Sequence, residues 1–180
     1  AVTITNVNEA PVITSNGGGA SASVSAAENQ TAATTVTSID VDGGTAVYSI
    51  VGGADAALFA IDAVTGLLTF DTPPNFEAPA DANADNVYVV VVQVSDGSLV
   101  DTQTLSVTVT NANEPPLITS NGGGVTASVG AAENQTAVTT VTSSDVDGGT
   151  AVYSIAGGAD AALFTINAST GALTFISGRN

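Results

Sequence analysis

The feature that most constrains this chain is an internal repeat. Residues 2–70 recur at residues 107–175 with a constant offset of 105 positions, without a gap, and about four positions in five are identical. The Asp-Val-Asp-Gly-Gly stretch of residues 40–44, for example, returns unchanged at residues 145–149. Self-similarity at a fixed period is typical of tandem copies of one structural unit. Both copies are therefore expected to build the same fold.

The repeat also sets the expected domain boundaries. We expect residues 1–9 to form the last strand of a preceding repeat, residues 10–113 a complete repeat, and residues 114–180 a truncated second repeat. The second repeat has no match to residues 74–111. Because the sequence opens inside a strand-like pattern, we expect the chain to be an excerpt from a longer protein.

Each unit is predicted to be all-β. Thr and Val dominate, glycine recurs at short intervals, and no long segment shows the helical period. Leu105, Val107 and Val109 alternate with polar residues, as in a strand with one buried face. Residues 87–94 are apolar on both faces, which predicts a central strand covered on both sides. Seven short segments predict a seven-stranded antiparallel Greek-key sandwich of immunoglobulin-like architecture; they are residues 12–15, 31–39, 46–50, 59–61, 67–70, 87–94 and 102–110.

Composition excludes several classes of function. The chain has one basic residue, Arg179, against 17 Asp and Glu, and it has no His or Cys. Nucleic acid is not expected as a partner, because contacts to phosphate need Lys or Arg. Disulfides, zinc–thiolate sites and nucleophiles that depend on His or Cys are excluded. Hydrophobic residues make up 44% of the chain, so it can build a core. No membrane-spanning segment or signal peptide is expected in this segment.

The acidic residues gather at a few expected loops and strand ends. Asp40 and Asp42 are two positions apart in an expected extended segment, so both side chains point to the same side. Such a pair suits Ca²⁺, which takes about six to eight oxygen ligands. A solvated acidic turn explains a single Asp-x-Asp equally well. Because no basic side chain accompanies these acids, a cation is the counter-charge that would relieve a repulsion of about 1–4 kcal/mol per close pair.

Six short motifs follow one another along the repeat: Ala27-Glu28-Asn29, Asp40-x-Asp42, Phe59-x-Ile61-Asp62-x-x-Thr65-Gly66, Phe76-Glu77, Val94-Ser95-Asp96-Gly97 and Asn111-Ala112-Asn113-Glu114-Pro115-Pro116. Their order resembles that of cadherin repeats. The resemblance covers the whole chain and is closest to the bacterial cadherin-like repeats of large secreted or surface adhesins.

The resemblance implies calcium ions at the junction between successive repeats, held by ligands from both. The junction set is Glu28, Glu77, Asn111, Asn113, Glu114, Asp145 and Asp147. A mirror set at the amino end is Asn6, Asn8, Glu9, Asp40, Asp42 and Asp96, and it is expected to be weak because its other half is not in the sequence. The linker has Asn111 where the family has Asp, and Glu114-Pro115 where it has Asp-Asn. Fewer or weaker ions than the three of animal relatives are therefore expected.

The resemblance implies a calcium-rigidified spacer or cell-adhesion module, extracellular or on the cell surface, in a bacterial adhesin. Without ions the junction carboxylates would repel, and with ions the angle between repeats would be fixed. Its expected partners are the neighbouring repeats of the same chain, with homotypic adhesion or cell-surface glycans as further candidates.

Two alternatives stay open beside this interpretation. The first is a carbohydrate-binding module of a secreted polysaccharide-active protein, for which Phe76 is the one aromatic residue expected in a loop. The second is an ion bound in the loop Asp81-Ala82-Asn83-Ala84-Asp85, which has alternating oxygen ligands but lacks the Gly and Glu of an EF-hand. An enzyme is not expected, because Asp40 and Asp42 point one way rather than across a substrate.

Overall fold

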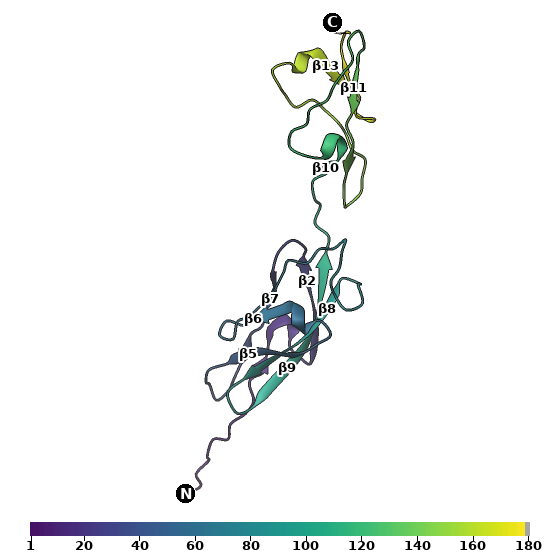
Figure 1. Cartoon of the computed structure of the whole chain (residues 1–180). Helices are drawn as coiled ribbons and strands as arrows, with labels where there is room; N and C mark the ends of the chain where they lie inside the picture. The colour runs from purple at the N-terminus through teal and green to yellow at the C-terminus, as the bar shows by residue number, and fades with distance from the viewer. Residues whose placement is uncertain (179–180) are drawn as a thin grey trace. The chain divides into compact units, whose positions relative to one another are not determined.

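A computed structural model describes residues 1–178, and it divides into two compact units, residues 1–112 and the residues from Asn113 onward. Figure 1 shows that both units are built from short strands joined by loops. The strands of unit 1 are β1 (Val12–Ile13), β2 (Ser21–Ala27), β3 (Ala32–Thr35), β4 (Ser38–Ile39), β5 (Val47–Gly52), β6 (Phe59–Ile61), β7 (Leu67–Phe70), β8 (Val87–Ser95) and β9 (Val100–Thr110), with single 3₁₀ turns η1 (Ser15–Gly17) and η2 (Ala56–Leu58).

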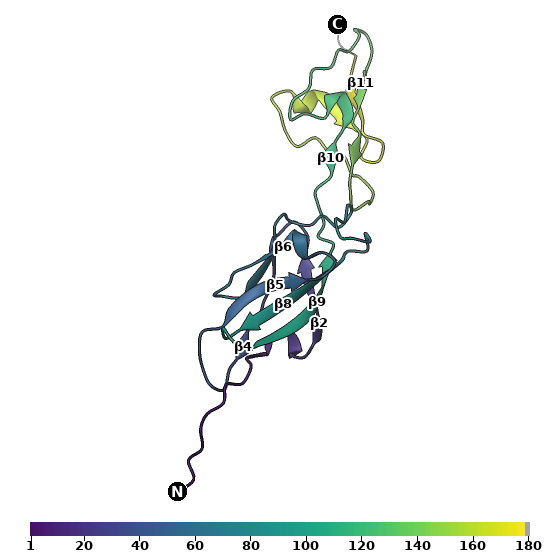
Figure 2. The same cartoon turned by 60° about the horizontal axis from the view of Figure 1, so that its bottom comes forward.

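Two sheets enclose the core of unit 1. The four-stranded sheet has the order β2-β9-β8-β5 (Figure 2), the three-stranded sheet has the order β3-β7-β6, and β1 pairs with β4. The inward side chains of β8 and β9 are almost fully buried against those of the smaller sheet. Tyr88 lies at the centre of this core. Its ring centroid is 5.2 Å from that of Phe70 and 6.3 Å from that of Phe59, and both pairs have edge-to-face geometry. The predicted all-β sandwich fold is confirmed.

Details of the larger sheet differ from the prediction. β2 was not predicted, because Ala22, Val24 and Ala26 alternate with Ser and carry little of the β-branched signal. It pairs in parallel with β9, whereas all other described pairs are antiparallel. β8 is central in the sheet as predicted, but its outward side chains are only partly buried. One side of this sheet therefore remains open to solvent.

The segment predicted as one strand over residues 31–39 forms two. Between β3 and β4, the Val36 N–H donates to the Gly66 carbonyl at 2.8 Å, and the Thr37 carbonyl accepts from Thr14 N–H at 2.9 Å. The chain thus leaves the β7 edge at Val36 and pairs with β1. The expected strand over residues 1–9 is not formed, since these residues are exposed and no strand lies beside them; their assignment to a preceding repeat stays a prediction.

The Asp62–Gly66 motif is a structural turn. The Asp62 carboxylate accepts the N–H groups of Thr65 and Val64, and the Thr65 bond, followed by the Val64 bond, holds the pKa of Asp62 below its usual value. Gly66 has a φ of +70°, and a Cβ there would collide with the Val36 carbonyl. In unit 2, Asn167 forms the same turn by accepting from Ser169 and Thr170.

Two carboxylates pin the loop between β7 and β8. Asp55 is 4% exposed and accepts the N–H groups of Ala82 and Val89, each at 2.7 Å. Asp81 is 6% exposed and accepts those of Asp85 and Asn86 at 3.0 and 3.1 Å. Burial acts to raise the pKa of Asp81, but the backbone donors together outweigh it and hold the pKa below its ordinary value. Among the described residues the acids of this loop do not gather into a group of three or more whose oxygens could share an ion, so the loop is better described as a hydrogen-bonded turn than as an ion site.

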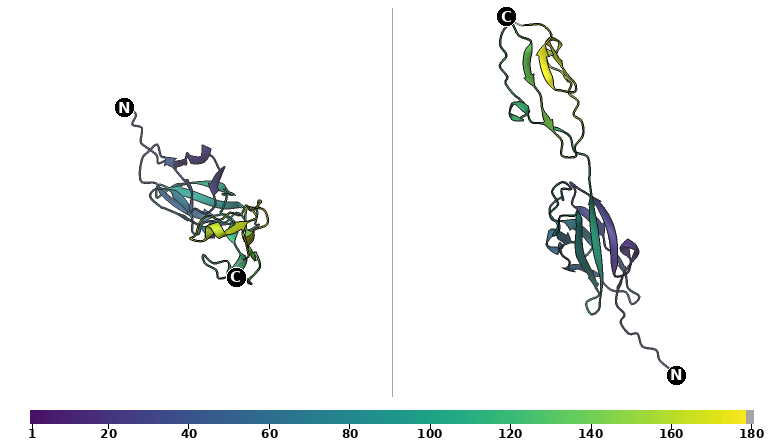
Figure 3. Two further views of the ribbon diagram at one scale, coloured as in Figure 1. Left: turned by 90° about the horizontal axis from the view of Figure 1, so that it is seen from above. Right: turned by 90° about the vertical axis from the view of Figure 1, so that its right-hand side faces the viewer.

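Within the described residues, unit 2 repeats the three-stranded sheet of unit 1 but not its four-stranded sheet. Its strands are β10 (Leu117–Ile118), β11 (Ala137–Thr140), β12 (Ser143–Ser144), β13 (Phe164–Ile166) and β14 (Ala172–Phe175), with turns η3 (Ser120–Gly122) and η4 (Ala161–Leu163). The sheet β11-β14-β13 repeats the register of β3-β7-β6, and β11 and β14 lie side by side in green and yellow in Figure 3.

The counterparts of β2 and β5 in unit 2, residues 126–132 and 152–157, are not strands. In unit 1, β2 pairs only with β9, and β5 pairs only with β8. The described residues of unit 2 hold no counterpart of these two central strands. The outer segments therefore have nothing to pair with, although their sequences are almost the same as in unit 1.

We expect Gly66→Ala to destabilise unit 1 by at least about 3 kcal/mol, since it combines left-handed strain with a steric collision. Gly17→Ala, at a φ of +85° with open space around the new Cβ, should cost only about 1 kcal/mol. Urea denaturation followed through unit 1 amide signals measures both. An equal loss of unfolding free energy in the two variants would show that the close approach of the Val36 carbonyl to Gly66 contributes nothing to the difference.

We expect Asp81→Asn to cost about 1–3 kcal/mol at pH 7, because an amide cannot accept both backbone N–H groups. A carboxyl with a lowered pKa in the folded state stabilises above its unfolded pKa, and this stability is lost as pH falls through the lowered value. The difference in the free energy of unfolding between the variant and the parent chain should therefore be smaller at pH 3 than at pH 7. Asp71→Asn, at an exposed position, is the control. If the stability difference between Asp81→Asn and the parent chain did not change with pH, the charged Asp81 carboxylate would not be the stabilising group.

Candidate metal centre

The amino end of unit 1 gathers three predicted acids with the segment that precedes β1. The Asp42 carboxylate accepts the Glu9 N–H and the Asn6 amide, each at 2.6 Å, and the Asp42 N–H donates to Asp40 at 2.9 Å. Asp96 accepts the Asn8 amide at 2.7 Å. The structure thus brings Asp40, Asp42 and Asp96 close to the side-chain amides of Asn6 and Asn8 and to the Glu9 N–H, and whether this set binds an ion stays a prediction.

The electrostatics of this end reflect the absence of a basic partner. The backbone N–H of Glu9, followed by the Asn6 amide, lowers the pKa of Asp42. The Leu99 N–H and then the Asn8 amide lower the pKa of Asp96. The pKa of Glu9 is raised, first through its side-chain hydrogen bond with Asp42 and then by the charge of Asp42. Glu9 therefore retains a proton more readily than an isolated Glu, which is the response of like charges that share one site.

The opposite end of unit 1 holds Glu28 and Glu77. Glu28 is 3% exposed, and its two oxygens accept the N–H groups of Ala112 at 2.8 Å and Phe76 at 2.9 Å. Glu77 accepts the Asn111 amide at 2.9 Å. The two glutamates offer oxygens within 4.8 Å of each other. The position of Glu28 follows from the end of β2, where its N–H donates to the Thr110 carbonyl at the end of β9.

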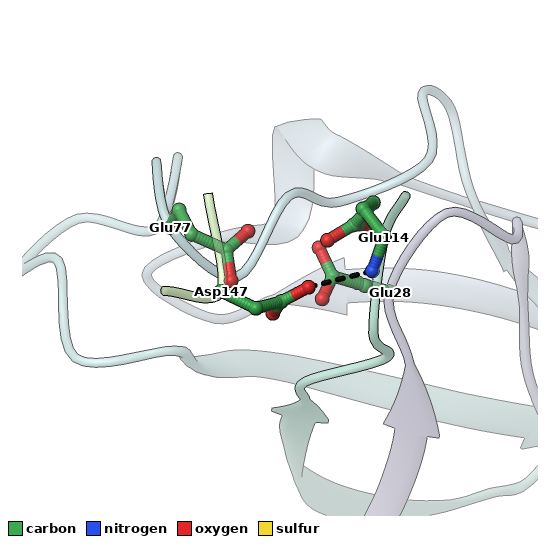
Figure 4. A group of neighbouring side chains, drawn as sticks. All are labelled: Glu28, Glu77, Glu114 and Asp147. Atoms are coloured by element: carbon green, nitrogen blue, oxygen red, sulfur yellow. Dashed lines mark hydrogen bonds between the residues drawn. The ribbon is translucent and has the colours of Figure 1, made fainter. Parts of the chain in front are cut away.

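The start of unit 2 repeats the amino end of unit 1. The Glu114 N–H donates to Asp147 at 2.6 Å, and the Asp147 N–H donates to Asp145 at 3.1 Å. The Asn113 amide donates to the Glu114 carbonyl at 3.0 Å, as that of Asn8 does to Glu9. Figure 4 draws acids of both units, namely Glu28 and Glu77 from unit 1 and Glu114 and Asp147 from unit 2, with the Glu114–Asp147 bond dashed.

The donor chemistry of all three clusters is that of hard cations. Each offers carboxylate and amide oxygens, which suit Ca²⁺ and Mg²⁺ rather than softer metals. Among residues 1–178 there is no Lys, Arg or His to pair with these acids. The sequence reasoning did not anticipate that backbone N–H groups would orient the carboxylates. The positions of Glu28 and Asp42 next to expected strand ends and turns, where backbone N–H groups are left without strand partners, could have indicated these bonds.

Other candidates are not part of these clusters. Glu133, the sequence counterpart of Glu28, is exposed because residues 126–132 form no strand to position it. Phe76 was the expected aromatic platform for a sugar, but it is partly buried and packs against the hydrophobic core. Packing against the core gives Phe76 a structural role, and the carbohydrate-binding alternative stays an untested prediction.

Comparisons with known proteins connect this arrangement to one kind of fold. No family model matches the chain, and no curated protein matches it. Among solved structures, protocadherin gamma B2 extracellular cadherin domains 3-6 superpose with a TM-score of 0.51 at 22% identity, over 98% of this chain and 45% of that one. Mouse cadherin-23 EC22-24 gives a TM-score of 0.52 at 19% identity, over 97% and 56%. Human protocadherin-24 EC1-2 gives 0.51 at 20% identity, over 95% and 81%.

These likenesses concern architecture. The chain spans less than half of the protocadherin gamma B2 fragment that it matches. Within residues 1–178, no helix has the length and apolar character that a membrane crossing needs. The structural neighbours agree with the strand arrangement of unit 1 and with the three-stranded sheet that unit 2 repeats. The fold of this chain is therefore cadherin-like.

Proposed function

We propose that this chain is a calcium-binding, cadherin-like segment of an extracellular adhesin, and that calcium bound between its units stiffens it as a spacer. The bacterial context is part of the proposal, since it comes from the resemblance of the sequence alone. The neighbouring repeats of the same chain are its first partners. The proposal depends on whether the carboxyl end of unit 1 and the start of unit 2 can supply ligands to one ion.

The observation that carries the proposal is a pair of backbone hydrogen bonds in the linker. Glu28 of unit 1 accepts from Ala112 N–H, and Asp147 of unit 2 accepts from Glu114 N–H. Two residues span at most about 7 Å. Covalent connection alone therefore keeps these two carboxylates near the same short stretch of chain, whatever angle the units adopt.

The linker residues add their own oxygens to this set. Asn111 lies against Glu77, and Asn113 and Glu114 follow directly. With Asp145 beside Asp147, the proposed ligands are the seven residues expected from the sequence: Glu28, Glu77, Asn111, Asn113, Glu114, Asp145 and Asp147. An ion there would replace the like-charge repulsion with shared attraction, which would restrict the swing of the linker.

The amino-end set of Asn6, Asn8, Glu9, Asp40, Asp42 and Asp96 is proposed as the half-site that a preceding unit would complete. Two of its hydrogen bonds, from Glu9 N–H to Asp42 and from Asp42 N–H to Asp40, recur at the start of unit 2. Because the residues of this chain supply only one side of it, its affinity for calcium should be the lower of the two. Millimolar extracellular calcium suits sites of this kind.

Calorimetric titration of the full chain with calcium tests the junction. We expect Glu28→Gln and Asp147→Asn each to weaken the tighter site at least tenfold, since each removes a charged ligand from a different unit. Asp62→Asn is the matched control: it removes one charge from unit 1 and keeps the turn, as Asn167 does naturally in unit 2. Unchanged affinity in both junction variants would overturn the proposed ligand set.

Thermal unfolding supplies an independent measurement. Free calcium at ten times its dissociation constant should stabilise the folded chain by about 1.4 kcal/mol per site. Chelator should remove this calcium-dependent stabilisation in the parent chain and in Asp62→Asn. In Glu28→Gln, chelator should have little effect on the unfolding temperature. An equal effect of chelator on all three chains would place the binding elsewhere.

A further inference from the structure

β2 is an outer strand of the four-stranded sheet of unit 1, and no described strand pairs with its other side (Figure 2). Two hydrogen bonds to β9 show which residues face that strand: the Thr104 N–H donates to the Ala20 carbonyl at 2.9 Å, and the Glu28 N–H donates to the Thr110 carbonyl at 3.1 Å. Successive residues of a strand point their N–H and C=O groups to opposite sides. The even-numbered residues of β2 therefore pair with β9. The odd-numbered residues, which direct their backbone groups to the open side, are Ser21, Ser23, Ser25 and Ala27.

The other outer strands of unit 1 carry features that block pairing with a further strand. β5 has a register shift between Ile50 and Gly52, and its Tyr48 N–H already donates to the Ala63 carbonyl at 3.0 Å. β3 also has a register shift, and β6 has only three residues. β2, in contrast, has seven residues in an unbroken register with β9, and it contains no Pro and no charged residue. Because folded proteins usually block their exposed edges, an edge without these features indicates a site for strand addition.

The sequence of β2 is complementary to itself in the antiparallel direction. Residues 22–26, Ala-Ser-Val-Ser-Ala, read the same in both directions and are centred on Val24. In an antiparallel pair with a twofold axis at Val24, Ser23 faces Ser25 of the second copy, and both residues have free backbone groups on that side. Ala22 and Val24, which pack against the core, then face Ala26 and Val24 of the second copy, so the inward face stays apolar across the axis. Registers centred on Ser23 or Ser25 would leave one end of β2 unpaired.

The distribution of charge also favours a second copy at this edge. The chain has a formal net charge of −16, so two copies repel each other wherever their acidic residues meet. β2 has no charged residue, and its neighbours on the outward face of β9 are Thr104, Ser106 and Thr108. Two copies can therefore approach along β2 without placing carboxylates opposite each other. Salt screens the remaining repulsion over longer distances, so the pairing should strengthen as ionic strength rises.

We propose that unit 1 binds a second copy of this chain through β2, which pairs antiparallel with β2 of that copy and joins the two four-stranded sheets into one. Backbone hydrogen bonds at Ser23 and Ser25 supply the affinity, and the palindrome around Val24 sets the register. Because each copy contributes one strand, the pairing is weak between free chains and becomes effective when many copies face each other on two surfaces. No residue of β2 belongs to the proposed calcium sites, so the pairing is tested separately from the proposed function.

Disulfide formation tests the register, because the full chain contains no cysteine of its own. In the proposed pair the two Val24 residues face each other at a non-hydrogen-bonded position, where Cα atoms lie about 4.5 Å apart and a disulfide can form. Under mild oxidation with chelator present, we expect Val24→Cys to form a covalent dimer about tenfold faster than Ser23→Cys, because the two Ser23 residues lie diagonally, about 7–8 Å apart. Ser106→Cys, on the outward face of β9, measures random collision. Equal rates in the three variants would overturn the proposal.

Amide exchange of the full chain, followed by NMR, supplies a second measurement. As the protein concentration rises, exchange should slow at Ser23 and Ser25 and change little at Ala22 and Val24, whose N–H groups face β9. Ser23→Pro removes a donor on the open side and leaves the pairing with β9 intact. It should abolish the dependence on concentration, while an unchanged Tyr88 signal shows that unit 1 is folded. Exchange at Ser23 and Ser25 that does not depend on concentration, or protection at Ser25 that survives in Ser23→Pro, would overturn the proposal.

Discussion

Backbone N–H groups, rather than basic side chains, orient the carboxylates of this chain, and the rest of the structure depends on this. Glu28 bridges the N–H groups of Phe76 and Ala112, Asp42 accepts that of Glu9, and Asp147 accepts that of Glu114. These bonds fix where the units begin and end. They supply no formal positive charge, and residues 1–178 contain no Lys, Arg or His, which is the physical reason why we propose a cation.

The same kind of bond has a second role inside unit 1. Asp55 and Asp81 are buried and bind only backbone N–H groups of the loop before β8 and of β8 itself. Acids of this chain thus fall into two classes that composition cannot separate. One class only holds loops in place, and the other, which includes the equally buried Glu28, lies at the ends of the units beside other carboxylates.

Much of the fold could be predicted from the sequence, because a repeat of about 105 residues and alternating Val and Thr leave few architectures. β9 could be predicted from the alternation of Leu105, Val107 and Val109 with polar residues. β2 was missed because its inward residues are mostly Ala, and its parallel pairing with β9 depends on the whole sheet. Asp55 was missed because its partner Val89 lies 34 positions away, and the packing of Phe76 against the core was missed because a loop position says little about burial. The acids of the amino end do lie close together, but both this set and the shared junction site stay proposals as ion sites.

A comparison of the two units shows how the larger sheet forms. Almost the same residues make a strand at Val47–Gly52 and irregular chain at residues 152–157. The difference is the presence of β8, which indicates that tertiary pairing and not local propensity decides the state of these segments. The smaller sheet, whose three strands pair among themselves, keeps its register in both units.

The central claim is that calcium couples the two units through the linker. Residual dipolar couplings of the full chain, measured with chelator and then with millimolar calcium, test it directly. The account predicts separate alignment tensors for residues 10–112 and 113–178 without calcium, and one common tensor when calcium is bound. Two independent tensors that calcium leaves unchanged, while calorimetry still detects binding, would contradict it.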